Sequence, residues 1–357
     1  MHNRAANKKY AAMENVNAVG LSVAVVKKGK IIYQEAFGAK NLATGTPLQS
    51  SDMFRIASIS KSFSATAIMQ LVEQKKLTLD DDISDLIGFK VRNPKYPDTK
   101  ITMRMMLSHT SSLNDSQGYF VLDVIHPDKN KDVAKCFNNY QPGTDYMYCN
   151  LNFNMIGTVI EKLSGERFDR YIAHHILKPL GLDGGFCVDS LDQSRFASLY
   201  EYSEGEFTEQ PTAYHPRREV IANYVMGYTT PVFSPTGGMK MSAPDLARYM
   251  TMHMNYGKSG KKRIISRKSA KLMQTPVLAK SEYGFALHER HKIIPGKKLV
   301  GHTGSAYGLY SYMFFDPKEK FGVVAITNGR KDIIEESTLG VGFLPEITKL
   351  LYDELIK

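Results

Sequence analysis

Strand-like segments lie at both ends of this 357-residue chain, and helix-like segments lie between them. Residues 21–26 and 31–37 are rich in β-branched side chains and flank a glycine-containing turn at residues 28–30, a pattern typical of a β-hairpin. Near the other end, further strands are predicted at residues 298–303, 309–315 and 321–327. Because strands come from both ends, we expect one sheet domain built from the two ends of the chain and carrying an inserted helical domain.

Apolar residues recur at helical spacing through the middle of the chain. Helices are predicted at residues 58–75, 103–107, 153–163 and 243–254. Gly165 is placed to end the third of these, and Pro244 lies in the first turn of the fourth. We also expect a short surface helix near residues 5–16 and a closing helix near 346–356. The sheet domain is assigned to residues 1–78 and 284–357, and the inserted, mostly helical domain to residues 79–283.

The formal net charge of +10 is concentrated in one part of the chain. No acidic residue occurs from Leu246 to Ser281. Seven basic residues cluster within that range: Lys258, Lys261, Lys262, Arg263, Arg267, Lys268 and Lys271. A solvated helix with its lead-in loop would account for this 258–271 cluster, and docking to an anionic polymer or membrane surface, such as a cell wall, is the sharper alternative. The cluster carries no nucleic-acid-binding motif, so no nucleic-acid partner is expected.

Cys136, Cys149 and Cys187 are too few for a closed disulfide framework, although one bridge is allowed in an oxidising compartment. Their spacing fits no zinc signature, and His288 with His291 lacks a third ligand, so no metal is expected. No glycine-rich phosphate loop occurs, and no other cofactor is expected. The chain contains no run of ~18 apolar residues, so no membrane span is expected.

The first residues, MHNRAANKKYAAMENVN, lack the apolar core of a secretion signal. The protein is therefore either cytoplasmic or a mature form from which a signal has been removed. We expect the second alternative, a periplasmic or secreted protein.

Ser58 and Lys61 form the first of three motifs that carry chemistry. In a helix, residues three apart share a face, so the Ser58 hydroxyl and the Lys61 amine can meet. A serine hydroxyl needs an adjacent base to become a nucleophile, and a lysine becomes that base when burial lowers its pKa. Taken alone, this pattern is also common on plain surface helices.

The second motif is Tyr148-Cys149-Asn150, and the third is His302-Thr303-Gly304-Ser305. The tyrosine could exchange a proton with Ser58, and the asparagine could hold Lys61 and substrate. The alternative is an aromatic core anchor followed by an asparagine helix cap. The third motif could bind an extended substrate along a strand, with the backbone N–H groups of Ser58 and Ser305 forming an oxyanion hole. The alternative is a strand that ends at glycine, with His302 satisfied in the core.

Taken together and in this order, the three motifs resemble the serine β-lactamase and penicillin-binding protein superfamily. Their spacing is most similar to the class C β-lactamase and DD-carboxypeptidase branch. The flanking segments agree over residues 18 to 330: FRIAS at 54–58, MLSHTSSL at 106–113, QPGT at 141–144, PLGL at 179–182, GGM at 237–239 and GHTG at 301–304. The resemblance implies an α+β, β-lactamase-like fold, in which an antiparallel sheet flanked by terminal helices carries the inserted all-helical domain. The site would lie in the cleft between the two.

The resemblance also implies a serine hydrolase that works through an acyl-enzyme. Ser58 would be acylated, with Lys61 and Tyr148 sharing the proton transfers. Asn150, His302, Thr303, Gly304 and Ser305 would bind the substrate. The substrate would be a small molecule or short peptide, most plausibly with an amide bond of a D-amino-acid peptide or a cell-wall-related fragment. A carboxylesterase of the same mechanism and a penicillin-binding sensor with little turnover are the alternatives.

Three positions, His302, Cys149 and Ser112, depart from the pattern of that branch, and the small Cys149 replaces a common serine or alanine. Class C β-lactamases usually carry a lysine, with its fixed positive charge, where this chain has His302. Histidine is only partly charged near neutrality, so the change weakens a β-lactamase assignment more than a hydrolase assignment. Ser112 replaces the usual glycine of the HTSGL-like turn, so a reshaped loop is expected if that position needs positive φ.

Overall fold

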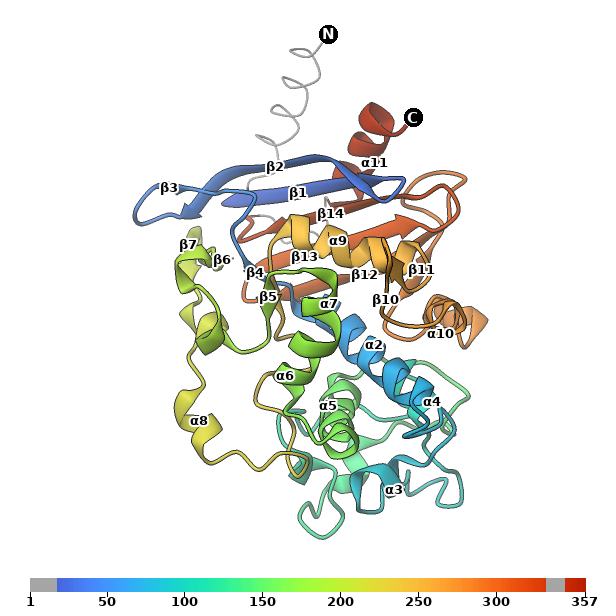
Figure 1. Ribbon diagram of the computed structural model, residues 1–357. Coiled ribbons are helices and arrows are strands. Elements are labelled where there is room, and N and C mark those ends of the chain that lie inside the picture. Colours follow the sequence, from blue (N-terminus) through green and yellow to red (C-terminus); the bar gives the residue numbers. More distant parts are fainter. Residues whose placement is uncertain (1–17, 332–343) are drawn as a thin grey trace.

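The computed structural model describes residues 18–331 and 344–357. A seven-stranded sheet, antiparallel at every pairing, lies at the centre of one half of the molecule, in the order β11-β12-β13-β14-β1-β2-β3 (Figure 1). Its strands are β1 (Gly20–Lys27), β2 (Lys30–Asn41), β3 (Thr46–Pro47), β11 (His288–Arg290), β12 (Leu299–Ala306), β13 (Leu309–Asp316) and β14 (Phe321–Thr327). The N-terminal strand β1 pairs with β14 from the other end of the chain, so the sheet is built from both ends as predicted.

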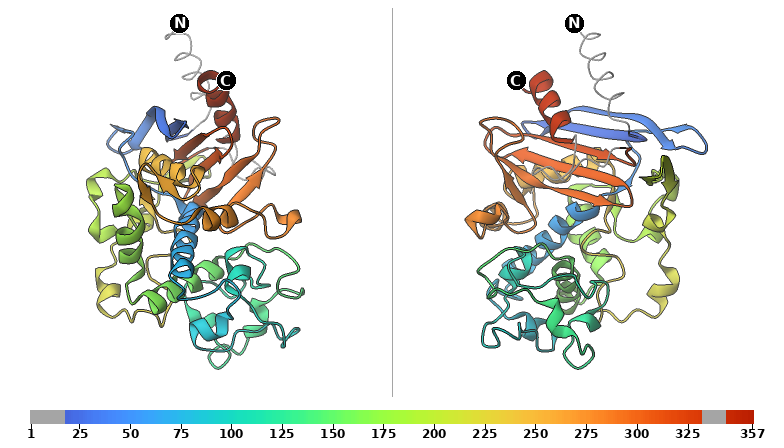
Figure 2. Two further views of the ribbon diagram at one scale, coloured as in Figure 1. Left: turned by 45° about the vertical axis from the view of Figure 1, so that its right-hand side comes forward. Right: turned by 180° about the vertical axis from the view of Figure 1, so that it is seen from behind.

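Helices cover both faces of the sheet around β1 and β14, because successive side chains of a strand point to opposite faces and these two strands are mostly apolar throughout. Ala24 and Val26 of β1 pack in the core cluster that contains α9 (Ala243–Met254). Leu21, Val23 and Val25 point the other way and pack with α11 (Leu344–Leu355). Figure 2 shows these two helices on opposite sides of the sheet. The sheet is therefore buried on both faces around β1 and β14.

The other half of the molecule is mostly helical (Figure 1). Its helices are α3 (Ile83–Ile87), α4 (Met103–Leu107), α5 (Asn150–Ser164), α6 (Phe168–Ile172), α7 (Lys178–Leu180) and α8 (Arg218–Ala222), with a π-helical stretch at Ala173–Leu177 between α6 and α7. The buried helix α2 (Ser60–Glu73) runs between the halves and packs against α5. The α+β fold predicted from the sequence is confirmed.

Short strands, one further α-helix and several 3-10 turns make up the rest of the described elements. A three-stranded sheet joins β4 (Phe54–Arg55), β8 (Lys240–Met241) and β5 (Gly184–Gly185). Hairpins are formed by β6 (Tyr200–Ser203) with β7 (Glu206–Glu209) and by β9 (Lys258–Ser259) with β10 (Lys262–Arg263), and α10 (Arg267–Met273) follows the second hairpin. No helix among the described residues is both long enough and apolar enough to span a membrane.

The predicted elements agree closely with the structure. The hairpin, the three C-terminal strands, α9 and the closing helix are all confirmed within a few residues. Gly165 ends α5 with a φ of 74°, as its position indicated. The helix expected near residues 5–16 lies outside the described residues. Helix α9 falls inside the range assigned to the helical domain yet packs on the sheet, and the division at residues 78 and 284 stays a prediction.

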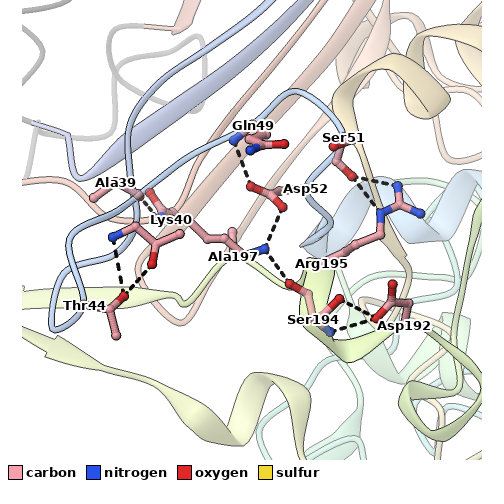
Figure 3. A network of polar contacts seen from close by, with 12 residues as sticks. Ala39, Lys40, Thr44, Gln49, Ser51, Asp52, Asp192, Ser194, Arg195 and Ala197 are labelled. Carbon is pink, nitrogen blue, oxygen red and sulfur yellow. Dashed lines mark hydrogen bonds and ion pairs between the residues drawn. The ribbon is translucent and has the colours of Figure 1, made fainter.

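A polar network fixes the segment that leads to Ser58 (Figure 3). Lys40 of β2 donates to the Asp52 carboxylate at 2.7 Å and to the Ser194 carbonyl at 2.5 Å. Arg195 donates to the Ser51 carbonyl from two nitrogens, at 3.1 and 2.7 Å. Backbone hydrogen bonds of Met53 extend this network toward β4. Because β4 ends three residues before Ser58, the network anchors the approach to that serine.

Candidate active site

Ser58 and Lys61 meet where a 3-10 turn, Ala57–Ile59, passes into α2. The Lys61 amine lies 3.1 Å from the Ser58 hydroxyl oxygen, so the predicted contact between them is confirmed. The amine also donates to Asn150 Oδ1 and to the backbone carbonyl of Thr236, each at 2.9 Å. These three acceptors fix the direction of the amine. The turn itself requires Ala57 to adopt a φ of 45°, a conformation unusual for a residue with a side chain.

The charge state of Lys61 suits a base. Its side chain is fully buried, and this burial lowers the pKa of Lys61 to about 7. The carboxylate of Asp115 opposes the effect of burial but does not overcome it. A substantial fraction of the amine is therefore neutral at physiological pH, with a lone pair available to the Ser58 proton.

Tyr148 lies next to this amine. The centre of its ring is 4.7 Å from Lys61 Nζ, so the lysine contacts the ring face rather than the phenol oxygen. The hydroxyl is buried beside Ser58, although the two do not meet the geometry of a normal hydrogen bond. Burial raises the pKa of Tyr148 far above its usual value. The phenol therefore carries its proton at neutral pH, which suits a proton donor better than a resting base.

Asn150 is the first residue of α5, and the side-chain helix cap considered for it is wrong. The cap position is Cys149, and no side chain caps the helix there. The Asn150 side chain instead accepts from Lys61 and from the Thr236 hydroxyl, at 2.9 and 2.8 Å. The amide thus holds the lysine, as the sequence predicted.

Asp115 orients that amide, and the sequence interpretation missed it. Its carboxylate accepts from the Asn150 side chain at 2.9 Å, and from the backbone N–H groups of Asn150 and Leu151 at 2.8 and 2.9 Å. The Cys149 thiol donates to it at 3.2 Å. An acidic residue just after the MLSHTSSL segment was the available signal, but its contact with α5 spans 35 residues and has no local pattern.

His302 is buried behind the site. Its Nε2 atom lies 3.0 Å from the Tyr283 hydroxyl, and its Nδ1 atom lies 2.5 Å from the Thr303 carbonyl. Burial, followed by the nearby Lys61 charge, lowers the pKa of His302 to about 3. The side chain is therefore neutral at pH 7 rather than partly charged, and it supplies no fixed positive charge to a substrate.

Gly304 brings β12 against the turn that carries the serine. A side-chain carbon at this position would come within 2.5 Å of the Ile56 carbonyl and would also clash with the Ser311 hydroxyl. That hydroxyl itself donates to the Ile56 carbonyl at 2.8 Å. The glycine therefore permits close packing inside the protein, while its predicted contact with a substrate backbone stays a prediction.

A cavity of ≈ 400 Å³ opens beside Ser58. Among the predicted site residues, Ser58, Tyr148, Asn150 and Ser305 line it. The other lining residues are Arg55, Ala57, Tyr119, Phe120, Glu201, Ser234, Thr236, Gly237, Ala306 and Tyr307. Lys61, His302, Thr303 and Gly304 are not in the lining. The cavity therefore brings together the serine, the phenol, the amide and the end of β12, which are the groups expected around an acyl donor.

The turn at Ser112 keeps the conformation that glycine would favour. Its φ is 64°, so the position does need positive φ, and the serine adopts it. Asn93 donates to the Ser112 hydroxyl at 3.0 Å, and Asn138 donates to its carbonyl at 2.7 Å. These bonds offset the strain of the left-handed conformation, so the loop is not rebuilt to avoid it.

The family of the chain follows from comparison with known proteins. The family model Beta-lactamase matches residues 10–337. The chain belongs to this family, within the superfamily of serine β-lactamases and penicillin-binding proteins. It is 27% identical over 327 residues to penicillin-binding protein 4 of Amycolatopsis lactamdurans, covering 87% of this chain and 81% of that protein. It is 22% identical over 329 residues to protein flp of Staphylococcus aureus (strain MW2), of which it covers 59%.

Solved structures share the same fold. The octameric penicillin-binding protein homologue from Pyrococcus abyssi superposes with a TM-score of 0.77 at 25% identity, over 99% of this chain and 77% of that one. D-amino acid amidase from Ochrobactrum anthropi SV3 gives a TM-score of 0.72 at 20% identity, over 96% and 97%. EstCE1, described as a hydrolase with promiscuous acyltransferase activity, gives 0.71 at 21% identity, over 98% and 97%. At these identities the last two show the fold alone.

Two other features singled out in the sequence take no part in the cavity lining. All seven basic side chains of the 258–271 cluster are exposed, and none takes part in the ion pairs found among residues 18–331 and 344–357. The three cysteines are buried and unpaired. Within the described part of the chain, no three His, Cys, Asp or Glu residues are grouped to hold a metal ion.

Proposed function

We propose that this protein is a serine hydrolase that forms an acyl-enzyme on Ser58. The observation that carries the proposal is the contact of 3.1 Å between the Ser58 hydroxyl and the Lys61 amine, whose pKa burial lowers to about 7. A serine paired with a lysine that is partly neutral at physiological pH is an activated nucleophile. The cavity beside Ser58 gives an acyl donor access to it.

The arrangement supports a specific order of proton transfers. Lys61 takes the Ser58 proton as the serine oxygen bonds to the substrate carbonyl carbon, and the oxyanion accepts hydrogen bonds from the backbone N–H groups of Ser58 and Ser305. Tyr148 donates its proton to the leaving group as the bond to that group breaks, and Lys61 then returns a proton to Tyr148. Water then attacks the acyl-enzyme, and the proton transfers run in the opposite order. The acyl group leaves as an acid, and Ser58 regains its proton.

The proposed substrates are amides of D-amino-acid peptides or related cell-wall fragments. Membership of the family supports this class, as do relatives named penicillin-binding protein and D-amino acid amidase. A carboxylesterase is the second candidate, because the neutral His302 lacks the fixed charge of a lysine at that position and Phe120, 64% exposed, gives the cavity an apolar rim. Cell-wall substrates would place the protein outside the cytoplasm, where the exposed 258–271 cluster would meet an anionic polymer.

The proposal is tested by comparing the wild type with Ser58→Ala and with Ser190→Ala, which alters an exposed serine outside the cavity lining. Each protein is assayed with a short 4-nitrophenyl ester and a D-Ala-D-Ala peptide. Loss of activity only in Ser58→Ala supports the proposal, and activity that survives in Ser58→Ala contradicts it. Brisk ester cleavage without peptide cleavage would favour the esterase. A lasting penicillin adduct without turnover would favour a penicillin-binding sensor.

A further inference from the structure

Arg55 lines the same cavity as Ser58. Among the described residues that line this cavity, Arg55 is the one with a basic side chain. It ends β4, three residues before the serine, and pairs in register with Lys240 of β8. The residue is only 8% exposed. A guanidinium group is effectively always protonated in proteins, so Arg55 keeps its charge although burial lowers its pKa. The cavity wall therefore carries a permanent positive charge.

This charge has no acidic partner within the described chain. Arg55 appears in none of the ion pairs there, and its guanidinium donates to two backbone carbonyls: Nε to Gly237 at 2.9 Å and Nη1 to Ala213 at 3.4 Å. The face of the guanidinium lies 5.1 Å from the centre of the Tyr307 ring. A buried cation that lacks a counter-ion is costly, and an incoming anion would relieve that cost.

The geometry leaves one edge of the guanidinium for such an anion. The Nη2 atom makes no hydrogen bond to any described residue, and it is not among the polar atoms sealed from solvent. Glu201, the acidic side chain in the cavity lining, is exposed and forms no ion pair with Arg55. Lys61 contacts the serine, and His302 is neutral.

We propose that Arg55 binds a carboxylate of the substrate and makes the enzyme selective for anionic acyl donors. The proposal deepens the proposed function and rests on it, because it places a carboxylate subsite in the same cavity as the acylated serine. It also supplies the positive charge that His302 does not. Tyr307, packed on the guanidinium, would hold its plane for the approach of the two carboxylate oxygens.

Two matched substrate pairs test this subsite on either side of the reacting carbonyl. The first pair is 4-nitrophenyl hydrogen glutarate and 4-nitrophenyl pentanoate, which differ by a carboxylate on the acyl group. The second is an N-acyl-D-Ala-D-Ala peptide and its C-terminal amide, which differ by a carboxylate on the leaving group. In the wild type we expect kcat/KM to favour the anionic member of at least one pair by about tenfold or more, the value of one charge-assisted hydrogen bond.

The variants Arg55→Gln and Arg55→Lys identify the source of that preference. Arg55→Gln is expected to reduce the ratio within the pair to about twofold or less, mainly through KM of the anionic member, while Arg55→Lys retains part of it. Arg170→Gln, which alters an exposed arginine outside the cavity lining, should keep the wild-type ratio. The ratio of kcat/KM for the anionic and neutral substrates is compared within each variant. This comparison cancels any general loss of activity caused by removing the hydrogen bond from Arg55 to the Gly237 carbonyl.

The outcomes separate this proposal from the one on which it rests. The carboxylate subsite is overturned if the wild-type values of kcat/KM for the anionic and neutral substrates agree within about twofold in both pairs. It is also overturned if Arg55→Gln keeps the wild-type preference. Neither result contradicts acylation of Ser58. If Arg55→Gln does not fold, the wild-type ratio and Arg55→Lys decide, and a lysine variant that exceeds the wild-type preference also overturns the subsite. If none of the four compounds acylates Ser58, as measured by intact mass, the proposed function itself is wrong and the subsite with it.

Discussion

Replacing Asp115 by asparagine removes one negative charge near Lys61 and changes the size of the side chain very little. Burial lowers the pKa of Lys61 to about 7, and the Asp115 charge opposes that effect. One amide links the two groups, because Asn150 donates to Asp115 at 2.9 Å and accepts from Lys61 at 2.9 Å. Asp115→Asn should therefore lower the pKa of Lys61 further.

The size of this change can be worked from the geometry. The two hydrogen bonds and the amide between them place the carboxylate and the amine at most about 8 Å apart, where an effective dielectric constant of about 20 gives an attraction of about 2 kcal/mol. This free energy corresponds to a change of about 1.5 in the pKa. Because the neutral amine is the active form, kcat/KM rises with pH through the pKa of Lys61. The midpoint of that rise should move from near pH 7 to about pH 5.5.

The assay is kcat/KM for a short 4-nitrophenyl ester, measured across this pH range and corrected for spontaneous hydrolysis. Asp123→Asn is the matched control, since Asp123 is exposed and paired with the equally exposed Lys129. The control should keep the wild-type midpoint. The maximal rate of Asp115→Asn should also fall, because the amide cannot accept from all of the donors that converge on the carboxylate. A midpoint that stays in place or moves to higher pH would refute the reasoning about Lys61.

Three further outcomes follow from the site. Tyr148→Phe should lower kcat for an amide substrate by about 10²- to 10⁴-fold with a small change in KM, because it removes the proposed proton donor, and steady-state kinetics check this. Gly304→Ala should destabilise the fold by about 1–3 kcal/mol through its clash with the Ile56 carbonyl, measured as a lower midpoint of thermal unfolding. His302→Gln should leave the midpoint of the pH–rate rise unchanged, because burial keeps the pKa of His302 near 3, whereas a moved midpoint would show that it titrates with the reaction.

Local patterns in the sequence were enough to predict most of the fold. The β-branched residues of β1 and the helical spacing after Ser58 each depend on neighbours within a few residues, and both predicted elements are confirmed. Pairing Ser58 with Lys61 also needed only the geometry of one helical turn. These predictions succeeded because the physical constraint lies within a single element.

The parts that were missed depend on contacts between distant segments. Asp115 reaches Asn150 across 35 residues, and the Thr236 carbonyl reaches Lys61 across 175, so no spacing rule points to either. The charge state of His302 depends on burial, which the sequence does not display, and the structure makes it neutral. The sequence interpretation gave Arg55 no role beyond its place in the FRIAS segment. Its position in the cavity and its lack of an acidic partner are visible only in the folded protein.

The central claim, acylation of Ser58, is tested most directly by intact-protein mass spectrometry after brief exposure to a penicillin and to an activated ester. We expect a mass increase equal to one acyl group, located on the peptide that contains Ser58, absent in Ser58→Ala and declining with time as water releases the acid. An adduct of the same mass in Ser58→Ala, or located on another residue, would contradict it. So would hydrolysis of the ester by Ser58→Ala at the wild-type rate.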